Sequence, residues 1–294
     1  MVELNGIKLK NRFLVSAGAL GYGMGWPWER PLIKMGLIKP GIFGGIATKT
    51  LTLEPRIGHY IDPFKFERRP LVSHLYHIFS GERKNVLMKI PGGWLNNMGW
   101  WNVGIDYFIK EIYPNLKGIS IIPNIGGFSI EEYLALIQKL NPLDVTAVEL
   151  DISCPNIKGE NGLERKDFPW LFREARRVSR HPLILKIGAS ESDINLAQTA
   201  AALGFDAISA INAVPVFGGG YSGLGIKYIA LKAVADLRKA VKIPIIGGGG
   251  IGSWKDCQEF FCVGADAVSF GSVHFPAPWK PTQIVSNLEP GSQL

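Results

Sequence analysis

The residues best suited to chemistry lie in the segment 149–156, which reads ELDISCPN. Its thiol, Cys154, has an ordinary pKa of about 8.5 that surroundings can tune toward neutrality, so it can accept or donate a proton. Pro155 stiffens the turn that presents it. A lone cysteine is more often a small buried hydrophobic residue, and Cys257 and Cys262 fit that interpretation because both fall within an expected helix. The context of Cys154 must therefore decide its role.

Two lysines, Lys49 and Lys186, stand inside otherwise apolar runs. A buried lysine is costly unless it meets an anion or loses its proton. Either side chain could point outward without consequence. Two such lysines on two runs, in a chain that also carries a glycine-rich turn, favour an anionic cofactor between them.

Two glycine turns come late in the chain. Gly247–Gly250 precede Ile251-Gly252-Ser253 and an expected helix, and Gly271-Ser272 follow the next apolar run. Glycine lets backbone N–H groups approach phosphate oxygens, and a helix N-terminus adds a favourable dipole. The spacing matches neither a P-loop nor the dinucleotide-binding fingerprint. Four glycines alone suit a plain tight turn equally well, but the pair of turns favours a phosphate site.

The elements that would position these residues alternate along the chain. Eight short apolar runs, rich in Ile and Val, are typical of strands buried on both faces, and they occupy 13–17, 42–49, 119–125, 145–152, 183–187, 206–211, 243–246 and 266–270. Helical periodicity marks 130–140, 167–180, 193–203, 226–241 and 254–263, the first behind a capping box of Ser129 and Glu132. We therefore expect one (β/α)8 TIM-barrel domain over residues 1–294, with an open doubly wound sheet as the alternative.

Two features decorate this barrel. Residues 2–10 alternate apolar and polar around Asn5-Gly6, which predicts an N-terminal β-hairpin. Residues 50–115 form a long insertion after the second strand, with two tryptophan-rich patches and no clear strand for the core. A connection of this length is more often a lid or binding loop than idle chain, although it could serve only packing or dimerisation.

In a barrel of this kind, chemistry takes place where the strands end and the next loops begin. The residues at those ends are polar or small, and they include Ala17, Gly18, Lys49, Thr50, Asn124, Cys154, Asn156, Lys186 and Asn212. A barrel built only for stability would not require polar strand ends. We therefore expect these side chains and the two glycine turns to converge on one face.

Charge and composition exclude several classes of protein. The net charge of +7 suits an anionic small molecule, because no block of like charges and no aromatic-and-basic stripe indicates nucleic-acid binding. Three cysteines argue against a disulfide framework. The N-terminus has no signal peptide, and no apolar run is long enough to span a membrane, so a cytoplasmic protein is expected.

Hydrolytic and metal-dependent chemistry are poorly supported. A Cys/His hydrolase needs a base beside Cys154, and surface placement is the expected interpretation for all five histidines: His59, His74, His77, His181 and His274. No metal site is expected, because the chain lacks Cys-x-x-Cys and His-x-x-x-His spacings.

Five motifs, in order and over nearly the whole chain, resemble the dihydroorotate dehydrogenase family. The similarity is to its soluble, cysteine-using class 1, and especially to the FMN subunit of the NAD-linked enzymes. The motifs lie at 48–58, 96–102, 149–156, 219–227 and 245–250.

The resemblance implies a cofactor and a reaction. FMN would lie over the barrel mouth, with its phosphate on Gly249, Gly250, Gly271 and Ser272. Its ring and ribityl chain would be lined by Ala17, Gly18, Lys49, Thr50, Asn124, Lys186, Asn212, Ser222 and Gly223. Cys154 would remove a proton from dihydroorotate while hydride passes to the flavin, giving orotate in pyrimidine biosynthesis.

The resemblance also implies a substrate pocket and partners. The substrate would contact Lys49, Asn96, Met98, Gly99, Trp100, Asp151, Asn156, Asn212 and Ala213. A second subunit carrying FAD and an iron–sulfur cluster would serve the FMN subunit, which would itself be a homodimer.

Three departures from the family pattern affect the substrate side. Asp151 stands where the family usually has Asn, and Ala213 where it often has Ser or Thr. The loop 99–102, Gly-Trp-Trp-Asn, is bulkier than usual. A paralogous flavin oxidoreductase with another cyclic or unsaturated substrate is therefore an alternative. A barrel without flavin, serving as a phosphate-ligand binder or scaffold, is the third.

Overall fold

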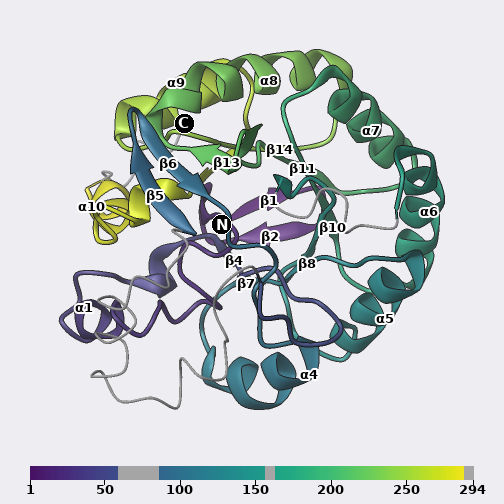
Figure 1. The fold of residues 1–294 in the computed structure, drawn as a ribbon, viewed down its shortest axis with the longest axis horizontal. Coiled ribbons are helices and arrows are strands. Elements are labelled where there is room, and N and C mark those ends of the chain that lie inside the picture. The colour runs from purple at the N-terminus through teal and green to yellow at the C-terminus, as the bar shows by residue number, and fades with distance from the viewer. Residues whose placement is uncertain (59–85, 156–162, 288–294) are drawn as a thin grey trace.

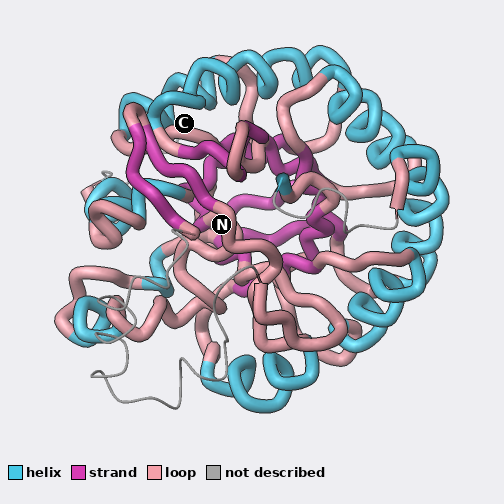
Figure 2. Tube along the Cα trace, in the orientation of Figure 1, coloured by secondary structure: helices cyan, strands magenta, loops and turns pink. Residues whose placement is uncertain are grey.

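Residues 1–58, 86–155 and 163–287 are described by this computed structural model, and their parallel strands form a barrel ringed by helices (Figures 1 and 2). The hydrogen-bonded order is β7-β4-β3-β15-β14-β11-β10-β9-β8. The two ends of this row, β7 and β8, are separated only by Pro123, so the sheet closes on itself. The predicted TIM barrel is confirmed, and the open-sheet alternative is wrong. The strands are β3 (Phe13–Val15), β4 (Gly45–Ala47), β7 (Ile121–Ile122), β8 (Asn124–Ile125), β9 (Val148–Asp151), β10 (Leu183–Ile187), β11 (Ala207–Ala210), β14 (Ile245–Gly248) and β15 (Ala267–Phe270).

The five predicted helices lie outside the barrel, and each begins and ends within two residues of its predicted bounds. They are α5 (Ile130–Leu140), α6 (Phe168–Val178), α7 (Glu191–Ala202), α8 (Lys227–Ala240) and α9 (Trp254–Cys262). Shorter helices are α1 (Arg30–Lys34), α4 (Ile105–Tyr107) with a π-helical turn over Phe108–Ile112, and α10 (Lys280–Ser286). Short 3-10 turns occupy Pro40–Ile42, Tyr113–Asn115, Arg165–Asp167, Leu224–Ile226 and Ser272–His274.

The predicted capping box at the start of α5 is only half formed. Ser129 Oγ accepts a hydrogen bond from the Glu132 backbone N–H at 3.3 Å, as predicted. The Glu132 carboxylate accepts from the backbone N–H of Phe128 at 2.8 Å, one residue before the position that a capping box requires. The helix therefore begins at the predicted residue with a variant of the predicted cap.

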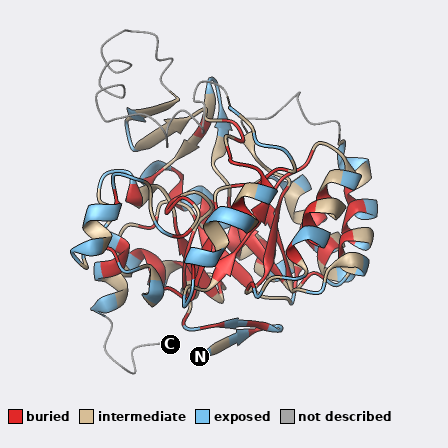
Figure 3. Ribbon diagram, turned by 90° about the horizontal axis from the view of Figure 1, so that it is seen from below, coloured by how far each residue is buried: buried red, intermediate tan, exposed pale blue. Residues whose placement is uncertain are grey.

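The N-terminal hairpin closes the lower end of the barrel (Figure 3). Strands β1 (Val2–Leu4) and β2 (Ile7–Leu9) pair antiparallel around Asn5 and Gly6, which have φ values of +48° and +88°. Both central residues of a type I′ turn need positive φ, which is why Asn-Gly predicts this hairpin. Leu4, Ile7 and Leu9 are buried against the inward side chains of the lower barrel.

A second sheet covers the opposite end of the barrel, and the sequence did not predict it (Figures 1 and 3). Its antiparallel order is β12-β13-β6-β5, from β5 (Leu87–Ile90), β6 (Gly93–Asn96), β12 (Val214–Val216) and β13 (Gly219–Ser222). Two-residue turns join each hairpin, Pro91-Gly92 and Phe217-Gly218, and both glycines have positive φ. The long insertion thus adds no barrel strand, as expected, but contributes β5 and β6 to this covering sheet; its residues 59–85 lie outside the described residues.

One arginine holds the loop between α8 and β14 at the lower rim. Arg238 Nη1 contacts Asp266 Oδ2 at 3.0 Å, and its Nη2 donates to the carbonyls of Val241 and Ile243, both at 2.8 Å. Asp266 Oδ2 also accepts from the backbone N–H of Ile245 at 2.8 Å. The same pattern recurs two helices earlier, where Arg176 binds Asp206 and two loop carbonyls. Each set satisfies backbone groups that a tight helix-to-strand loop would otherwise leave unpaired.

We expect Arg238→Met to lower the free energy of unfolding by about 2 kcal/mol, because it removes an ion pair and two charge-assisted hydrogen bonds. Urea unfolding followed by circular dichroism measures the change. Arg177→Met is the matched control, because within the described ranges Arg177 pairs with Glu174 alone and its side chain is 71% exposed. That control should cost less than about 0.5 kcal/mol, and equal losses in the two variants would contradict the role of Arg238.

Candidate functional site

The carboxyl ends of the barrel strands open into a cavity of about 390 Å³ beneath the covering sheet. This volume lies within the range of small-molecule sites. Nearly all the described residues predicted for the site line it, namely Ala17, Gly18, Lys49, Thr50, Asn96, Met98, Gly99, Trp100, Asp151, Cys154, Lys186, Asn212, Ala213, Ser222, Gly223, Gly249, Gly250, Gly271 and Ser272. Asn124 lies outside the lining, and Asn156 lies outside the described residues.

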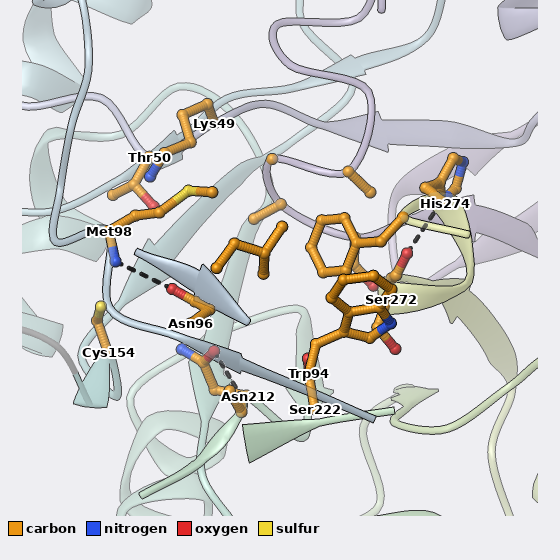
Figure 4. A pocket seen from close by; sticks show the side chains of 18 of the residues that line it. Lys49, Thr50, Trp94, Asn96, Met98, Cys154, Asn212, Ser222, Ser272 and His274 are labelled. Atoms are coloured by element: carbon orange, nitrogen blue, oxygen red, sulfur yellow. Dashed lines mark hydrogen bonds between the residues drawn. The ribbon is translucent and has the colours of Figure 1, made fainter. Parts of the chain in front are cut away.

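The cavity has two ends of different chemistry (Figure 4). Cys154, Asn96 and Asn212 gather on one side, and Ser272 and His274 lie on the other. The first side, which we call the thiol end, is built from side chains. The second, the glycine end, is built mainly from backbone.

Cys154 follows β9 and is partly exposed to the cavity. The other two thiols lie on α9, away from this cavity. Cys257 is buried, and burial raises its pKa to about 12, so it is an unreactive packing residue as predicted. Cys262 is exposed, so the expectation that it too is a small buried hydrophobic residue is wrong. The two thiols are five residues apart, so Cys262 lies about 140° around the helix from the buried face that carries Cys257.

Lys186 on β10 is 6% exposed and meets an anion, as its burial demands. Its Nζ lies 3.9 Å from Glu149 Oε1, and it stands opposite Asp151 in the parallel ladder between β9 and β10. Glu149 is itself held by Asn124, whose Nδ2 donates to Oε1 at 2.6 Å. The ammonium group of Lys186 thus lies beside carboxylates of the neighbouring strand β9, and one of these carboxylates is held in turn by Asn124 of β8.

Lys49 follows β4 and points into the same cavity. Burial lowers the pKa of its ammonium group, while the nearby Cys154 and Asp151 raise it. Gly18, with φ +78°, lies against this side chain, because a Cβ there would sit 3.1 Å from Lys49 Cδ. The absence of a side chain at Gly18 therefore allows the loop after β3 to lie close to the lysine.

Asp151 is buried at the end of β9, and burial raises its pKa above the ordinary value, although the nearby Lys186 opposes that shift. Its Oδ1 accepts from the backbone N–H of Ser153 at 3.0 Å and from Ser153 Oγ at 3.2 Å. Asn212 Nδ2 donates to the same oxygen at 3.2 Å. Three donors thus converge on one oxygen of the buried carboxylate, and these hydrogen bonds favour its ionised form against the effect of burial.

The glycine end is shaped by backbone that other residues could not adopt. Gly249 and Gly250 follow β14 with φ values of +125° and +77°. A Cβ on Gly250 would lie 2.8 Å from the Gly223 carbonyl oxygen and 2.9 Å from Lys227 Cβ. The turn then leads into α9, where Ser253 Oγ caps the helix by accepting from Asp256 N. Close backbone approach of this kind is what an anionic group requires.

His274 was predicted to lie on the surface, and this is wrong. It lines the cavity, is 3% exposed, and has Nδ1 3.0 Å from the carbonyl oxygen of Gly271. Burial lowers its pKa to about 4, so the imidazole is neutral. Its place two residues after Ser272, inside the phosphate-type turn, was the signal that could have located it.

Aromatic residues of the cavity were also missed. Trp26 stacks between Trp28 and Trp101, with ring centroids 5.4 and 5.3 Å apart and nearly parallel planes. Trp94 on β6 packs edge-on against Phe275. The loop after β3 thus contributes more than Ala17 and Gly18, because it reaches across the mouth to the tryptophan-rich loop 99–102.

Asn124 supports the site from below. It is fully buried, and its amide nitrogen donates to Glu149, while its Oδ1 has no hydrogen-bond partner among the residues that the structure describes. A buried carbonyl oxygen without a donor costs free energy, so a ligand N–H or an ordered water would stabilise it.

The described residues hold no group of three or more His, Cys, Asp or Glu side chains placed to bind a metal ion. Over the same ranges, none of the helices has the length and apolar character needed to cross a lipid bilayer.

Comparison with known proteins identifies relatives of the whole barrel. A family model described as dihydroorotate dehydrogenase matches residues 79–290. The chain is 35% identical over 98% of its length to the "Dihydroorotate dehydrogenase B (NAD(+)), catalytic subunit" of Caldicellulosiruptor bescii, covering 92% of that protein. Proteins of the same name from Petrotoga mobilis and Bacteroides thetaiotaomicron are each 32% identical, over 98% and 94% of this chain and 92% and 88% of theirs.

We expect His274 to make stability fall in mild acid. Its folded pKa of about 4 lies below the ordinary value of 6.5, so the unfolded chain takes up the proton first as pH falls. This contribution is complete above pH 6.5 and is lost progressively down to pH 4, by about 2 kcal/mol between pH 7 and pH 5. His274→Asn, which keeps a donor toward Gly271, should show a shallower decline in urea unfolding at those two pH values. Identical slopes would contradict this assignment.

Proposed function

Because the chain belongs to the dihydroorotate dehydrogenase family, we propose that it is a flavin-dependent oxidoreductase that oxidises dihydroorotate to orotate in pyrimidine biosynthesis. One observation carries the proposal. A single cavity holds a thiol at one end and glycine turns at the other, with Lys49 and Lys186 between them. That is the arrangement needed to set a base and a phosphorylated redox cofactor against one substrate.

The cofactor that we propose is FMN, and the residues present fit it. Gly249, Gly250, Gly271 and Ser272 would hold the phosphate, since the first two expose backbone that bears no side chain. Lys186 would place positive charge beside the ring. Asn124 lies outside the cavity lining, and it would act on the cofactor through Glu149, whose Oε1 lies 3.9 Å from Lys186 Nζ. The remaining residues would line the ring and ribityl chain: Ala17, Gly18, Lys49, Thr50, Asn212, Ser222 and Gly223.

The reaction removes a proton and a hydride from adjacent carbons, and bound FMN would supply the hydride acceptor. Cys154 would take the proton as its thiolate. Lys49 favours that thiolate, because the two groups interact electrostatically and a cation lowers the free energy of a nearby anion. The covering sheet would exclude water while the proton is held.

The substrate would be bound at the thiol end. The backbone N–H of Met98 donates to Oδ1 of Asn96, at the end of β6, at 3.2 Å, and this hydrogen bond orients the Asn96 amide. With the loop backbone of Gly99 and Trp100 and the charge of Lys49, it would hold the substrate carboxylate. The ring of the substrate would be contacted by Asp151, Asn212 and Ala213. Asn156 would also contact it, but this residue lies outside the described residues.

We also infer a partner subunit. The three relatives are named catalytic subunits of an NAD(+) enzyme. A second subunit carrying FAD and an iron–sulfur cluster would receive the electrons from this chain, which would itself form a homodimer.

A second candidate function is favoured by the carboxylate of Asp151. A paralogous flavin oxidoreductase acting on another cyclic or unsaturated compound would use the same flavin site, but its thiol end would bind a different substrate. A steady-state assay with dihydroorotate separates the two, because normal turnover contradicts the changed-substrate alternative.

Cys154→Ala should retain flavin and lose turnover of dihydroorotate by about 10²–10⁴-fold, because it removes only the base. Visible absorbance of the purified protein measures the flavin, and steady-state kinetics measure turnover. Cys262→Ala, which removes an exposed thiol on α9, should leave both unchanged. Unchanged turnover in Cys154→Ala would remove this thiol from the mechanism.

Gly250→Ala should weaken flavin retention at least tenfold, because the new Cβ meets Gly223 and Lys227 and the φ of +77° disfavours alanine. Gly252→Ala in the same turn is the control, since its Cβ would meet nothing closer than 4.0 Å. Flavin bound per chain is measured by absorbance after dialysis, and circular dichroism checks folding. Full flavin content in a folded Gly250→Ala protein would overturn the proposed phosphate site.

A further inference from the structure

Asp151 and Asn212, at the thiol end of the cavity, are joined by a hydrogen bond that affects which ligand groups this wall can bind. Asn212 follows β11, and both hydrogens of its Nδ2 have acceptors inside the protein: Asp151 Oδ1 at 3.2 Å and Ser153 Oγ at 3.1 Å. Its Oδ1 accepts from the backbone N–H of Ala213 at 2.8 Å. An amide nitrogen has two hydrogens, so no donor of Asn212 remains for a ligand in this arrangement.

Asp151 and the backbone N–H of Ala213 together fix this arrangement. If the Asn212 amide turned over, its oxygen would face a carboxylate oxygen, and its nitrogen would face the donating N–H of Ala213. Both contacts would be repulsive. An amide in place of the Asp151 carboxylate would keep its oxygen toward the donating N–H of Ser153, so its NH2 group would stand where the carboxylate has its second oxygen. The carboxylate therefore differs from an amide in offering an acceptor, and not a donor, at this second position.

The pair consequently offers acceptors to the cavity that both residues line. The Asn212 carbonyl oxygen has a second lone pair beyond the one used by Ala213. The second carboxylate oxygen of Asp151 receives no hydrogen bond from the residues that the structure describes, since all three donors converge on Oδ1. A ligand carbonyl facing this wall would meet like partial charges, whereas a ligand N–H would be bound.

We propose that Asp151 is a specificity-determining residue, which together with Asn212 makes this wall accept hydrogen bonds and selects substrates presenting N–H groups toward it. This inference rests on the proposed function, because it takes the cavity to bind a cyclic substrate. The substrate class is a nitrogen heterocycle whose edge beside Asp151 carries ring N–H or amino groups. A ring carbonyl at that edge is disfavoured.

The test compares nearly isosteric ligands in the flavin-loaded protein. The probes are orotate and the two analogues in which one or the other ring carbonyl is replaced by an amino group. All three carry the same carboxylate, so the ratio of their dissociation constants cancels the effect of overall charge. Perturbation of the flavin absorbance on titration gives each constant, and calorimetry provides an independent value.

Asp151→Asn is expected to shift the ratio at least tenfold toward orotate for at least one analogue, because the new amide nitrogen at position 151 can donate to a ring carbonyl. Asp236→Asn removes the same charge from the exposed face of α8 and should leave both ratios unchanged. If neither ratio shifts by more than threefold in Asp151→Asn, the inference is overturned.

The wild-type protein provides a second measurement should Asp151→Asn fail to fold. It is expected to bind one amino analogue no more than threefold more weakly than orotate, and a preference for orotate above tenfold over both analogues overturns the inference. Failure of the proposed function looks different, because then none of the three acids binds to wild type or variant and dihydroorotate is not oxidised.

Discussion

Two lysines and two carboxylates share the buried mouth of the barrel, and the need to neutralise them constrains the rest of the site. Lys186 faces Glu149 across the ladder and stands opposite Asp151, while Lys49 is drawn toward Asp151 and Cys154. An unpaired buried charge would cost several kcal/mol, so these groups must remain together. They come from β4, β9 and β10, and only a closed barrel brings those strand ends to one cavity.

The covering sheet strengthens the interactions between these charged groups, because it excludes water from them. Strands β5 and β6 come from the insertion, while β12 and β13 follow β11, and Gly220 to Ser222 pair with Trp94 to Asn96 across the mouth. Exclusion of water strengthens every electrostatic interaction beneath the sheet, including that between Lys49 and the thiol at position 154. The same pairing places Asn96 and Ser222 in the cavity wall.

The features that could be predicted from sequence are those with local signals. Apolar runs located the eight barrel strands, Asn5-Gly6 located the lower hairpin, and most predicted site residues line one cavity because parallel strands end at one face. The covering sheet could not be predicted, since β6 and β13 are far apart in sequence and neither run is strongly apolar. His274 was misplaced because burial of a neutral imidazole depends on a hydrogen bond to Gly271 and on packing that periodicity does not encode.

The two ends of the cavity differ in which amino-acid substitutions they can accept. At the glycine end, contacts depend on backbone whose positive φ and crowded Cβ positions exclude almost every substitution at Gly249 and Gly250. At the thiol end, the hydrogen-bonding character of the wall depends on single atoms of Asp151 and Asn212. Exchanging oxygen for nitrogen there reverses a donor and an acceptor without altering shape. A fold of this design can keep its cofactor site constant while the ring that it recognises varies, and for this reason Asp151 bears on specificity while the glycine turns bear on flavin binding.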